Sequence, residues 1–416
     1  MKLKAIIHTF LSRFLILILS FGLVIFSTNM WGSDGKGVIS IVTADLAMVI
    51  FFSNIFSGSS VSYFAPKHRQ EQIMIFAYLW SLIVGITVPL VLGVFHPSEF
   101  TYYLIGMSIL SSLLSANINL FIGRQNIRMY NFYTVMQLLV FVVLILGFIY
   151  VLKIESVRVY FLAQIVCLSI LFLTSFFQII RHQTLSGISF SRRIGAGLFS
   201  YGWKSQLSAF LQFLNNRLSF YYLEFFRGLT SVGIFSVGVA CSEAIWTVSR
   251  SLALVLYSDI INSDNPEESL LRTKISMKMS FSVTLLFIVI ILLIPADLYT
   301  MVFGKDFRGT KKIILLLSPG ILAIAVSNII GFYFAGINMM KILNIKSIVG
   351  LLFTAVCSLY FIPKWGISGA CIVTSVSYCL SSGLLLWKFY QLTDFHITDF
   401  IISKSEMKVL LIKLKK

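Results

Sequence analysis

The sequence has little charge and few acidic residues. Asp and Glu number 16 among 416 residues, and all charged residues together make up 12% of the chain. A soluble domain carries about twice that charged share, roughly 25%. Hydrophobic residues make up 58% and occur in blocks long enough to cross a ~30 Å hydrocarbon core as helices. The composition excludes a soluble enzyme or a nucleic-acid-binding domain and predicts an all-α, polytopic integral membrane protein.

The sequence also lacks the signatures of catalysis and of metal binding. It contains no P-loop, no HExxH and no G-x-S-x-G pattern, and its five histidines are scattered. Its five cysteines all fall in apolar blocks without metal or disulfide spacing, so we interpret them as small apolar side chains. We therefore expect no enzyme activity and no cofactor. If the protein transports a substrate, the energy must come from an ion gradient, from the membrane potential or from the gradient of the substrate itself.

The hydrophobic blocks predict twelve membrane spans. The basic N-terminus precedes an apolar run that is too long for a signal peptide and lacks a cleavage site, so we expect an uncleaved first span. The predicted spans are 10–31, 38–62, 73–95, 100–122, 131–152, 158–180, 197–222, 230–256, 279–300, 313–337, 344–362 and 367–389.

The distribution of Lys and Arg predicts the orientation. With the N-terminus in the cytoplasm, 21 of the 33 basic residues, Lys346 among them, fall on the cytoplasmic side, 9 on the opposite side and 3 inside spans. Cytoplasmic loops carry such an excess of basic residues. We therefore expect both termini in the cytoplasm, which requires an even number of spans.

The polar stretch 181–194 divides the spans into two sets of six. We predict an N-terminal lobe at 1–185, a basic cytoplasmic connector at 186–194, a C-terminal lobe at 195–390 and a basic cytoplasmic tail at 391–416. Ser40 and Ala44 match Ser236 and Ala240 at an offset of 196 residues. Either a six-span repeat or a chance similarity of apolar sequence explains the match. Repeated halves are common in transporters.

A few charged or amide side chains remain inside the predicted spans. Each ionised group near the bilayer centre costs at least ~2.5–3.5 kcal/mol, so such residues are candidates for a substrate path. Arg13 and Lys204 lie near cytoplasmic ends, where the alternative is snorkelling to the phosphate layer. For Glu243 the alternative is a structural pair with Lys204 or Arg217. The candidates are Arg13, Asp45, Asn54, Lys204, Asn216, Arg217, Glu243 and Arg250.

Two features predict broken or bent helices. The stretch Phe56–Ser60 is rich in small residues, and Pro89 removes a backbone donor from the third span. Either position is a candidate hinge, and an ordinary kink is the alternative.

Several short motifs resemble those of Wzx-type O-antigen and polysaccharide-unit flippases, which belong to the multidrug/oligosaccharidyl-lipid/polysaccharide exporter superfamily. The resemblance extends over nearly the whole chain and includes the twelve spans and their division into two sixes. The motifs are Gly32–Gly37, Ser57–Ser60 followed by Tyr63 and Pro66–Lys67, Tyr201–Gly202, Val232–Ser236, and Ser242–Glu243 followed by Trp246.

The resemblance implies a function and a location. Such proteins flip an undecaprenyl-diphosphate-linked oligosaccharide across the bacterial inner membrane through a central cavity that opens alternately. It implies a cationic lumen supplied here by Lys204, Arg217 and Arg250. It also implies the lipid bilayer and other polysaccharide-assembly membrane proteins as partners. Family members often carry an Asp soon after the Arg of the seventh span. Here Leu218 and Ser219 follow, which leaves Glu243 and Asp45 for ion coupling.

Two other functions stay open at this point. A multidrug/cation antiporter of the related efflux branch would need acidic residues in its lumen, whereas the charges inside these spans are mostly basic. A polytopic glycan polymerase or ligase usually holds its active site in a large outer loop, whereas the outer loops predicted here are short.

Overall fold

The computed structural model describes residues 3–181, 191–261, 265–337 and 339–393. Side chains are described from residue 15 onward, except at positions 127, 208, 248, 254–255, 257–259, 261 and 340. Every regular element in these ranges is a helix, which confirms the expected all-α class. The chain forms two compact units, residues 1–213 and 214–416. The predicted tail at 391–416 and most of the predicted connector at 186–194 lie outside the described residues. The division between the units falls inside a helix, about 20 residues after that connector.

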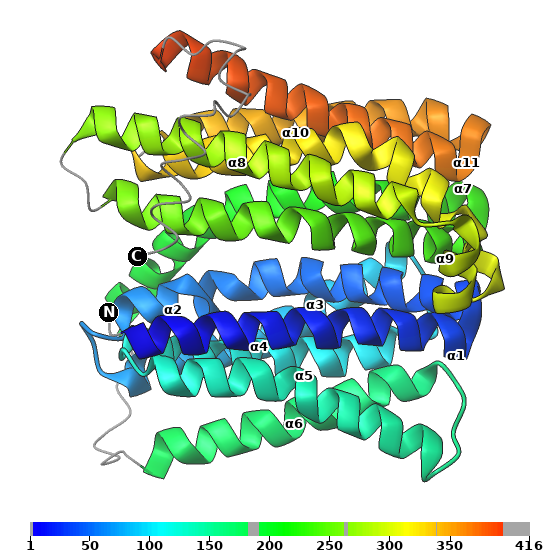
Figure 1. The fold of residues 1–416 in the computed structure, drawn as a ribbon. Coiled ribbons are helices and arrows are strands. Elements are labelled where there is room, and N and C mark those ends of the chain that lie inside the picture. Colours follow the sequence, from blue (N-terminus) through cyan, green and yellow to red (C-terminus); the bar gives the residue numbers. More distant parts are fainter. Residues whose placement is uncertain (1–2, 182–190, 262–264, 338, 394–416) are drawn as a thin grey trace. The chain divides into compact units, whose positions relative to one another are not determined.

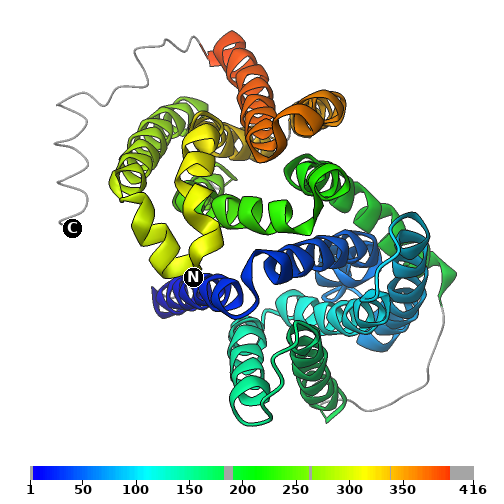
Figure 2. The same cartoon turned by 90° about the vertical axis from the view of Figure 1, so that its right-hand side faces the viewer.

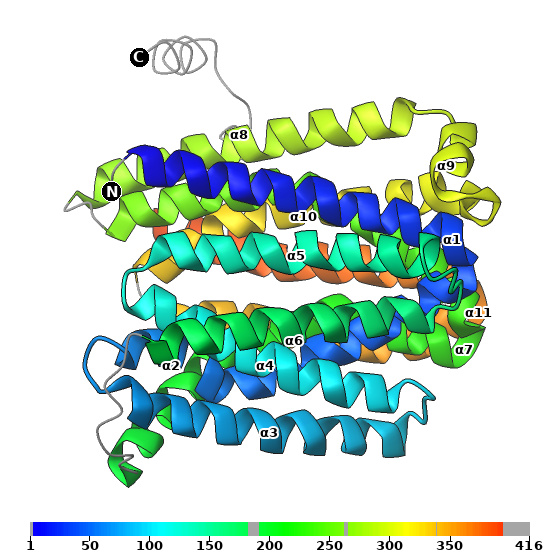
Figure 3. The same ribbon diagram turned by 90° about the horizontal axis from the view of Figure 1, so that it is seen from below.

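Unit 1 is a bundle in which α1 packs against α3, α4 and α5, and α6 packs against α4 and α5 (Figures 1 and 3). Its large core joins apolar side chains from all of these helices. The helices of unit 1 are α1 (Leu3–Ser57), α2 (Ser59–Phe64), α3 (Gln70–Phe95), α4 (Thr101–Gly123), α5 (Ile127–Tyr150), α6 (Arg158–Arg181) and the first part of α7 (Arg192–Ile261).

Unit 2 contains the rest of α7 and a bundle in which α10 packs against α8 and α11. Figure 2, which looks along the helix axes, shows α11 (orange to red) beside α10. The remaining elements are α8 (Pro266–Leu293), α9 (Ala296–Phe303), the short 3₁₀ helix η1 (Lys305–Gly309), α10 (Thr310–Gly336) and α11 (Met340–Thr393).

Three helices contain a sharp reversal at a glycine. The helices α1, α7 and α11 are 55, 70 and 54 residues long, far more than the ~20 residues that one crossing of a bilayer needs. Each is interrupted at a glycine with positive φ, a conformation that side chains disfavour: Gly32 (63°), Gly228 (79°) and Gly366 (54°). In Figure 1 the beginning of α1 and the following α2 accordingly lie at the same end of the bundle.

These reversals account for the number of spans. Nine helical stretches of the described residues are long and apolar enough to cross a membrane, and three of them are 45–53 residues long. Each of those three contains one of the reversals. Each long stretch therefore supplies two antiparallel arms, which brings the apolar arms to the predicted twelve. The protein is a multi-pass membrane protein.

The reversals also support the repeat. Gly228 follows Gly32 by 196 residues, the same offset at which Ser236 matches Ser40. In each half, therefore, the chain reverses between the first two spans at a single glycine with a positive φ angle. A chance similarity of apolar sequence does not require a backbone feature to recur at the same offset, so this coincidence favours a duplicated six-span unit.

The ninth predicted span, 279–300, is wrong at both ends. The helix α8 begins at Pro266, because the side chain of Asn265 accepts hydrogen bonds from the backbone N–H groups of Glu267 and Glu268. It ends at Leu293 because Pro295, which has no N–H, follows. Pro89, one of the two candidate hinges, lies inside α3, which continues past it to Phe95.

The other candidate hinge, at Gly58, is a true helix break and is held by close packing. Gly58 separates α1 from α2 with a non-helical backbone. Just before the break, Gly202 of α7 meets Ile55 so closely that a Cβ on Gly202 would overlap the carbonyl of Ile55. The hydroxyls of Ser59 and Ser205 are 2.8 Å apart beside this contact. Small residues of this kind let membrane helices approach closely.

Gly202→Ala should destabilise the protein by about 1–3 kcal/mol, because the added methyl group overlaps backbone and cannot be relieved by a rotamer change. Thermal unfolding in detergent, followed by labelling of the buried free cysteines such as Cys167 and Cys371, measures the change. Gly22→Ala is the matched control, since nothing lies within 4 Å of its added Cβ. An unfolding midpoint for Gly202→Ala as high as that of the control would contradict this packing.

Candidate functional site

The central feature among the intramembrane charges is an ion pair within α7. Arg217 precedes the reversal at Gly228 and Glu243 follows it, so the two arms bring the side chains together. Arg217 Nη2 lies 3.0 Å from Glu243 Oε1, and the side chains are 28% and 34% exposed. Of the alternatives for Glu243, the structure shows the pair with Arg217. Pairing lowers the cost of each charge inside a bilayer.

Aromatic side chains border this pair. The guanidinium of Arg217 lies 5.0 Å from the centre of the Phe220 ring, one turn along α7. Trp246, one turn after Glu243, contacts Tyr378 of α11 with ring centres 5.9 Å apart. A cation over an aromatic face is stabilised by the ring quadrupole. Aromatic rings therefore lie beside the ion pair, and about one third of the surface of each charged side chain is exposed.

A network of neutral hydrogen bonds lies beside Arg217. Asn215 is 2% exposed, and its Oδ1 accepts hydrogen bonds from Thr354 Oγ1 at 2.9 Å and Ser377 Oγ at 3.0 Å. The hydroxyls of Ser219 and Thr374 are 2.9 Å apart. These bonds join α7 to both arms of α11. They fix the helix that carries Arg217 without adding charge. Asn216 is partly buried and makes interactions of its own.

Each of the other predicted candidates has surroundings of its own. Arg250 is exposed on α7. Lys204 is exposed too and lies in the part of α7 that belongs to unit 1. Asp45 is buried and makes interactions of its own. Asn54 accepts hydrogen bonds from Ser115 at 3.1 Å and Ser57 at 3.4 Å, next to the Gly58 break. The side chain of Arg13 lies outside the described part of the chain.

Lys346 and Glu224 are charged residues inside helices that the sequence reasoning did not name as candidates. Lys346 was counted with the cytoplasmic loops, yet it lies inside α11 and its ammonium donates to Ser327 Oγ of α10 at 3.1 Å. The signal was its position inside the predicted span 344–362. Glu224 lies in α7, two residues past the predicted span 197–222. It is partly buried and makes interactions of its own.

A cluster of rings joins two motifs that lie far apart in sequence. Tyr63 of α2 stacks on Tyr201 of α7 with ring centres 4.4 Å apart and planes 13° apart. The Lys67 ammonium lies 3.6 Å from the centre of the Tyr63 ring. Both tyrosines are exposed. This cluster lies at the Gly58–Gly202 contact, at the end of the bundle for which the basic residues predict a cytoplasmic location.

The fold and the charges define a polytopic membrane protein whose spans carry cations as well as the Arg217–Glu243 ion pair. Within the described ranges, no three His, Cys, Asp or Glu side chains form a group that could hold a metal. No protein-family model and no curated protein matches the chain.

Solved structures share the fold. The lipid II flippase MurJ in an inward closed conformation has a TM-score of 0.73 and 15% identity, and the match covers 100% of this chain and 92% of that one. An inward-facing multidrug resistance MATE family transporter of the MOP superfamily has a TM-score of 0.67 and 14% identity, with coverages of 91% and 98%. A MOP superfamily transporter from Pyrococcus furiosus Vc1 (DSM3638) has a TM-score of 0.62 and 15% identity, with coverages of 93% and 94%. The chain therefore has the fold of the MOP superfamily transporters.

Arg217→Met and Glu243→Leu should each lower stability, because each change leaves the remaining charge without its partner inside the membrane. The double variant should be more stable than the sum of the single changes predicts. Since both side chains are about one third exposed, we expect a coupling of about 1 kcal/mol. A double-mutant cycle of thermal unfolding measures it. Arg250→Met combined with Glu243→Leu is the control and should be additive, and additivity at Arg217 would contradict the pair.

Lys346→Met should raise stability by about 1 kcal/mol or more, because it removes a charge from inside a helical hairpin while keeping a long side chain. Ser327→Ala should lower stability in the unmodified protein, since it removes the acceptor of the ammonium, and should have little effect in the Lys346→Met background. Thermal unfolding of the four proteins tests both statements. A loss of stability in Lys346→Met would show that the lysine is a structural requirement.

Proposed function

We propose that this protein is a flippase that moves a diphosphate-linked saccharide on a polyprenyl lipid across the bacterial inner membrane, of the Wzx type that the sequence motifs resemble. Both termini are cytoplasmic in this proposal. The lipid-linked oligosaccharide is the substrate, the protein cycles by alternating access, and other polysaccharide-assembly membrane proteins are its partners. Arg217, Arg250 and Lys204 attract the diphosphate.

The observation that carries the proposal is the balance of charge inside the helices. The carboxylate of Glu243 is engaged by Arg217. In contrast, no ion pair is recorded among the described residues for Lys204, Arg250 or Lys346, although Lys346 donates to the hydroxyl of Ser327. A path with cations in excess favours an anionic substrate, since a diphosphate supplies the missing counter-charge.

The fold does not by itself choose between the two transport classes, because both a lipid II flippase and multidrug transporters share it. A drug/cation antiporter needs a carboxylate that is free to bind its cations, and the carboxylate of Glu243 is already engaged by Arg217. A polymerase or ligase would need a large outer domain. The described connections between α3 and α4 and between α5 and α6 are only 96–100 and 151–157.

Arg217→Ala and Arg250→Ala should each reduce the surface glycan of a host that depends on this protein by roughly tenfold, because each change removes a charge-assisted contact from a desolvated path. Quantitative immunoblotting of the surface glycan measures the effect, and the amount of membrane-inserted protein is measured in parallel. Arg272→Ala is the matched control, since Arg272 forms an exposed pair with Glu268 one turn away.

Normal glycan in both Arg217→Ala and Arg250→Ala would remove these residues from the mechanism. Restored resistance to cationic drugs in a pump-deficient strain, without any effect on surface glycan, would favour the antiporter instead.

A further inference from the structure

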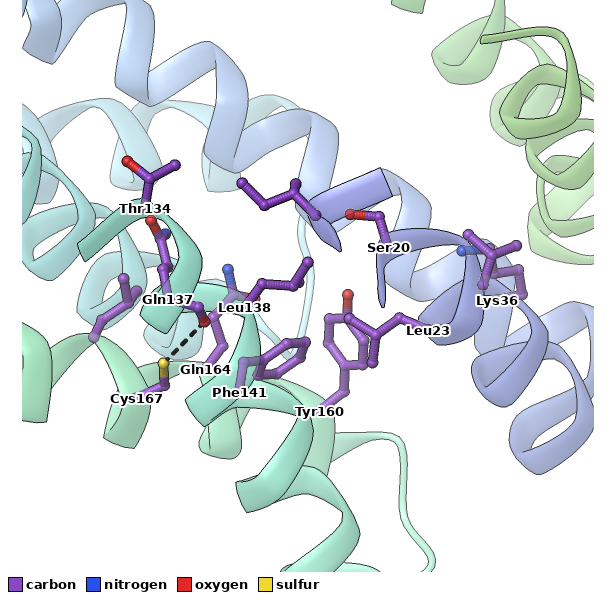
Figure 4. Close-up of a pocket in the computed structure, with 13 residues that line it drawn as sticks. Ser20, Leu23, Lys36, Thr134, Gln137, Leu138, Phe141, Tyr160, Gln164 and Cys167 are labelled. Carbon is purple, nitrogen blue, oxygen red and sulfur yellow. Dashed lines mark hydrogen bonds between the residues drawn. The ribbon is translucent and has the colours of Figure 1, made fainter. Parts of the chain in front are cut away.

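Unit 1 contains a cavity of about 380 Å³ between the first arm of α1, α5 and α6. Figure 4 shows Lys36 at one end of the lining, with Thr134 and Gln137 toward the other end and Tyr160 between them. The lining includes Ser20 of α1, Gln137 and Phe141 of α5, and Tyr160 and Gln164 of α6.

Four polar side chains in this lining have no recorded hydrogen-bond partner within the described part of the chain. They are the amides of Gln137 and Gln164 and the hydroxyls of Ser20 and Tyr160. Their neighbours differ. The hydroxyl of Thr134 donates to the Tyr130 carbonyl at 2.8 Å, and the thiol of Cys167 donates to the Gln137 carbonyl at 3.2 Å. Ser20 is exposed, and Gln137, Tyr160 and Gln164 are partly buried, so the structure gathers unengaged donors and acceptors at one place in unit 1.

Partly buried groups of this kind favour a polar occupant. Leaving an amide or a hydroxyl without a hydrogen bond in an apolar medium costs several kcal/mol in transfer experiments, so buried polar groups normally find a partner. Two glutamine amides together offer four N–H donors and two carbonyl acceptors. The two hydroxyls can each donate and accept. A cavity with this lining is filled either by water alone or by a ligand with many hydroxyl groups.

The character of the lining favours a sugar ring over a cation or a lipid tail. No carboxylate lines the cavity, so a cation would find no counter-charge. A lipid tail would leave the amides unsatisfied. Phe141 and Tyr160 meet edge to face, with centres 5.0 Å apart and planes 83° apart, and supply an aromatic wall. Aromatic surface beside planar amides matches the apolar faces and the equatorial hydroxyls of a pyranose.

We propose that this cavity of unit 1 is a saccharide subsite, in which Gln137, Gln164, Ser20 and Tyr160 hydrogen-bond a neutral sugar ring against Phe141. The subsite rests on the proposed function, because the sugar is a residue of the lipid-linked substrate. It separates two tasks. The cations recognise the diphosphate, which all such substrates share, and the cavity recognises the sugar, which differs from one glycan to another.

The test is saturation-transfer NMR on the full-length protein in nanodiscs. The probes are free neutral hexoses, 6-deoxyhexoses and N-acetylhexosamines, with tetraethylammonium as a cationic comparison. At least one sugar should receive saturation, and the signal should fall about tenfold in the double variant Gln137→Leu/Gln164→Leu, because the amide hydrogen bonds are lost. Thr134→Val is the matched control and should keep the signal, since its hydroxyl is already bonded to the backbone.

Three results overturn the subsite: no saturation of any sugar, equal saturation in the double variant, or stronger saturation of tetraethylammonium than of any sugar. Leucine suits an apolar bundle, and an unchanged thermal midpoint of the double variant verifies its fold. The outcome is separable from that of the proposed function. If Arg217→Ala abolishes surface glycan and no sugar binds, only the subsite fails. If sugar binds but Arg217→Ala leaves glycan normal, only the diphosphate path fails.

Discussion

A bilayer interior offers no hydrogen bonds and little solvation for charge, and this constraint shapes every element of the chain. Each backbone N–H and C=O must be satisfied within its own helix, so the chain crosses the apolar layer only as helices. Turns are kept short for the same reason. At Gly32, Gly228 and Gly366 the chain reverses at a single residue in a left-handed conformation, which leaves few backbone groups outside a helix.

The same constraint separates the polar side chains into those that have a hydrogen-bond or ion-pair partner and those for which no partner is recorded in the described part of the chain. Asn215 satisfies two hydroxyls and Glu243 satisfies Arg217, so these groups stabilise the packing of α7. Other polar groups are not used up by the packing of the helices. They are the exposed Lys204 and Arg250, the ammonium of Lys346, and the amides and hydroxyls that line the unit 1 cavity. A polar or charged side chain inside a membrane carries a large free-energy cost, and such residues usually have a functional role.

Much of the fold was predictable from the sequence, because hydropathy reports the demand of the bilayer directly. The twelve apolar arms and the break at Gly58 followed from composition and from small residues. The start of α8 at Pro266 did not, since its first turns are polar and apolarity alone locates only the part inside the membrane. Lys346 was assigned to a loop because a charge near the end of a span resembles one outside it.

The candidate site was only half predictable. The charges that matter are rare and stand out in an apolar sequence, so Arg217 and Glu243 were identified. The sequence left Lys204 and Arg217 both open as partners of Glu243. The choice between them depends on the angle at which the two arms of α7 meet at Gly228, which no local pattern encodes. The cavity was missed because glutamine, serine and tyrosine are unremarkable in a sequence. Only the packing of α1 against α5 and α6 shows that Gln137 and Gln164 lack partners among the described residues.

The most direct test of the account is a leaflet assay on the purified protein in proteoliposomes. A fluorescent polyprenyl-diphosphate disaccharide is incorporated into the vesicles, and a membrane-impermeant quencher reports the fraction of the lipid in the outer leaflet over time. The account predicts that the protein accelerates exchange of this lipid between leaflets and does not accumulate ethidium against an imposed proton gradient. Accumulation of ethidium without exchange of the lipid-linked saccharide would contradict it.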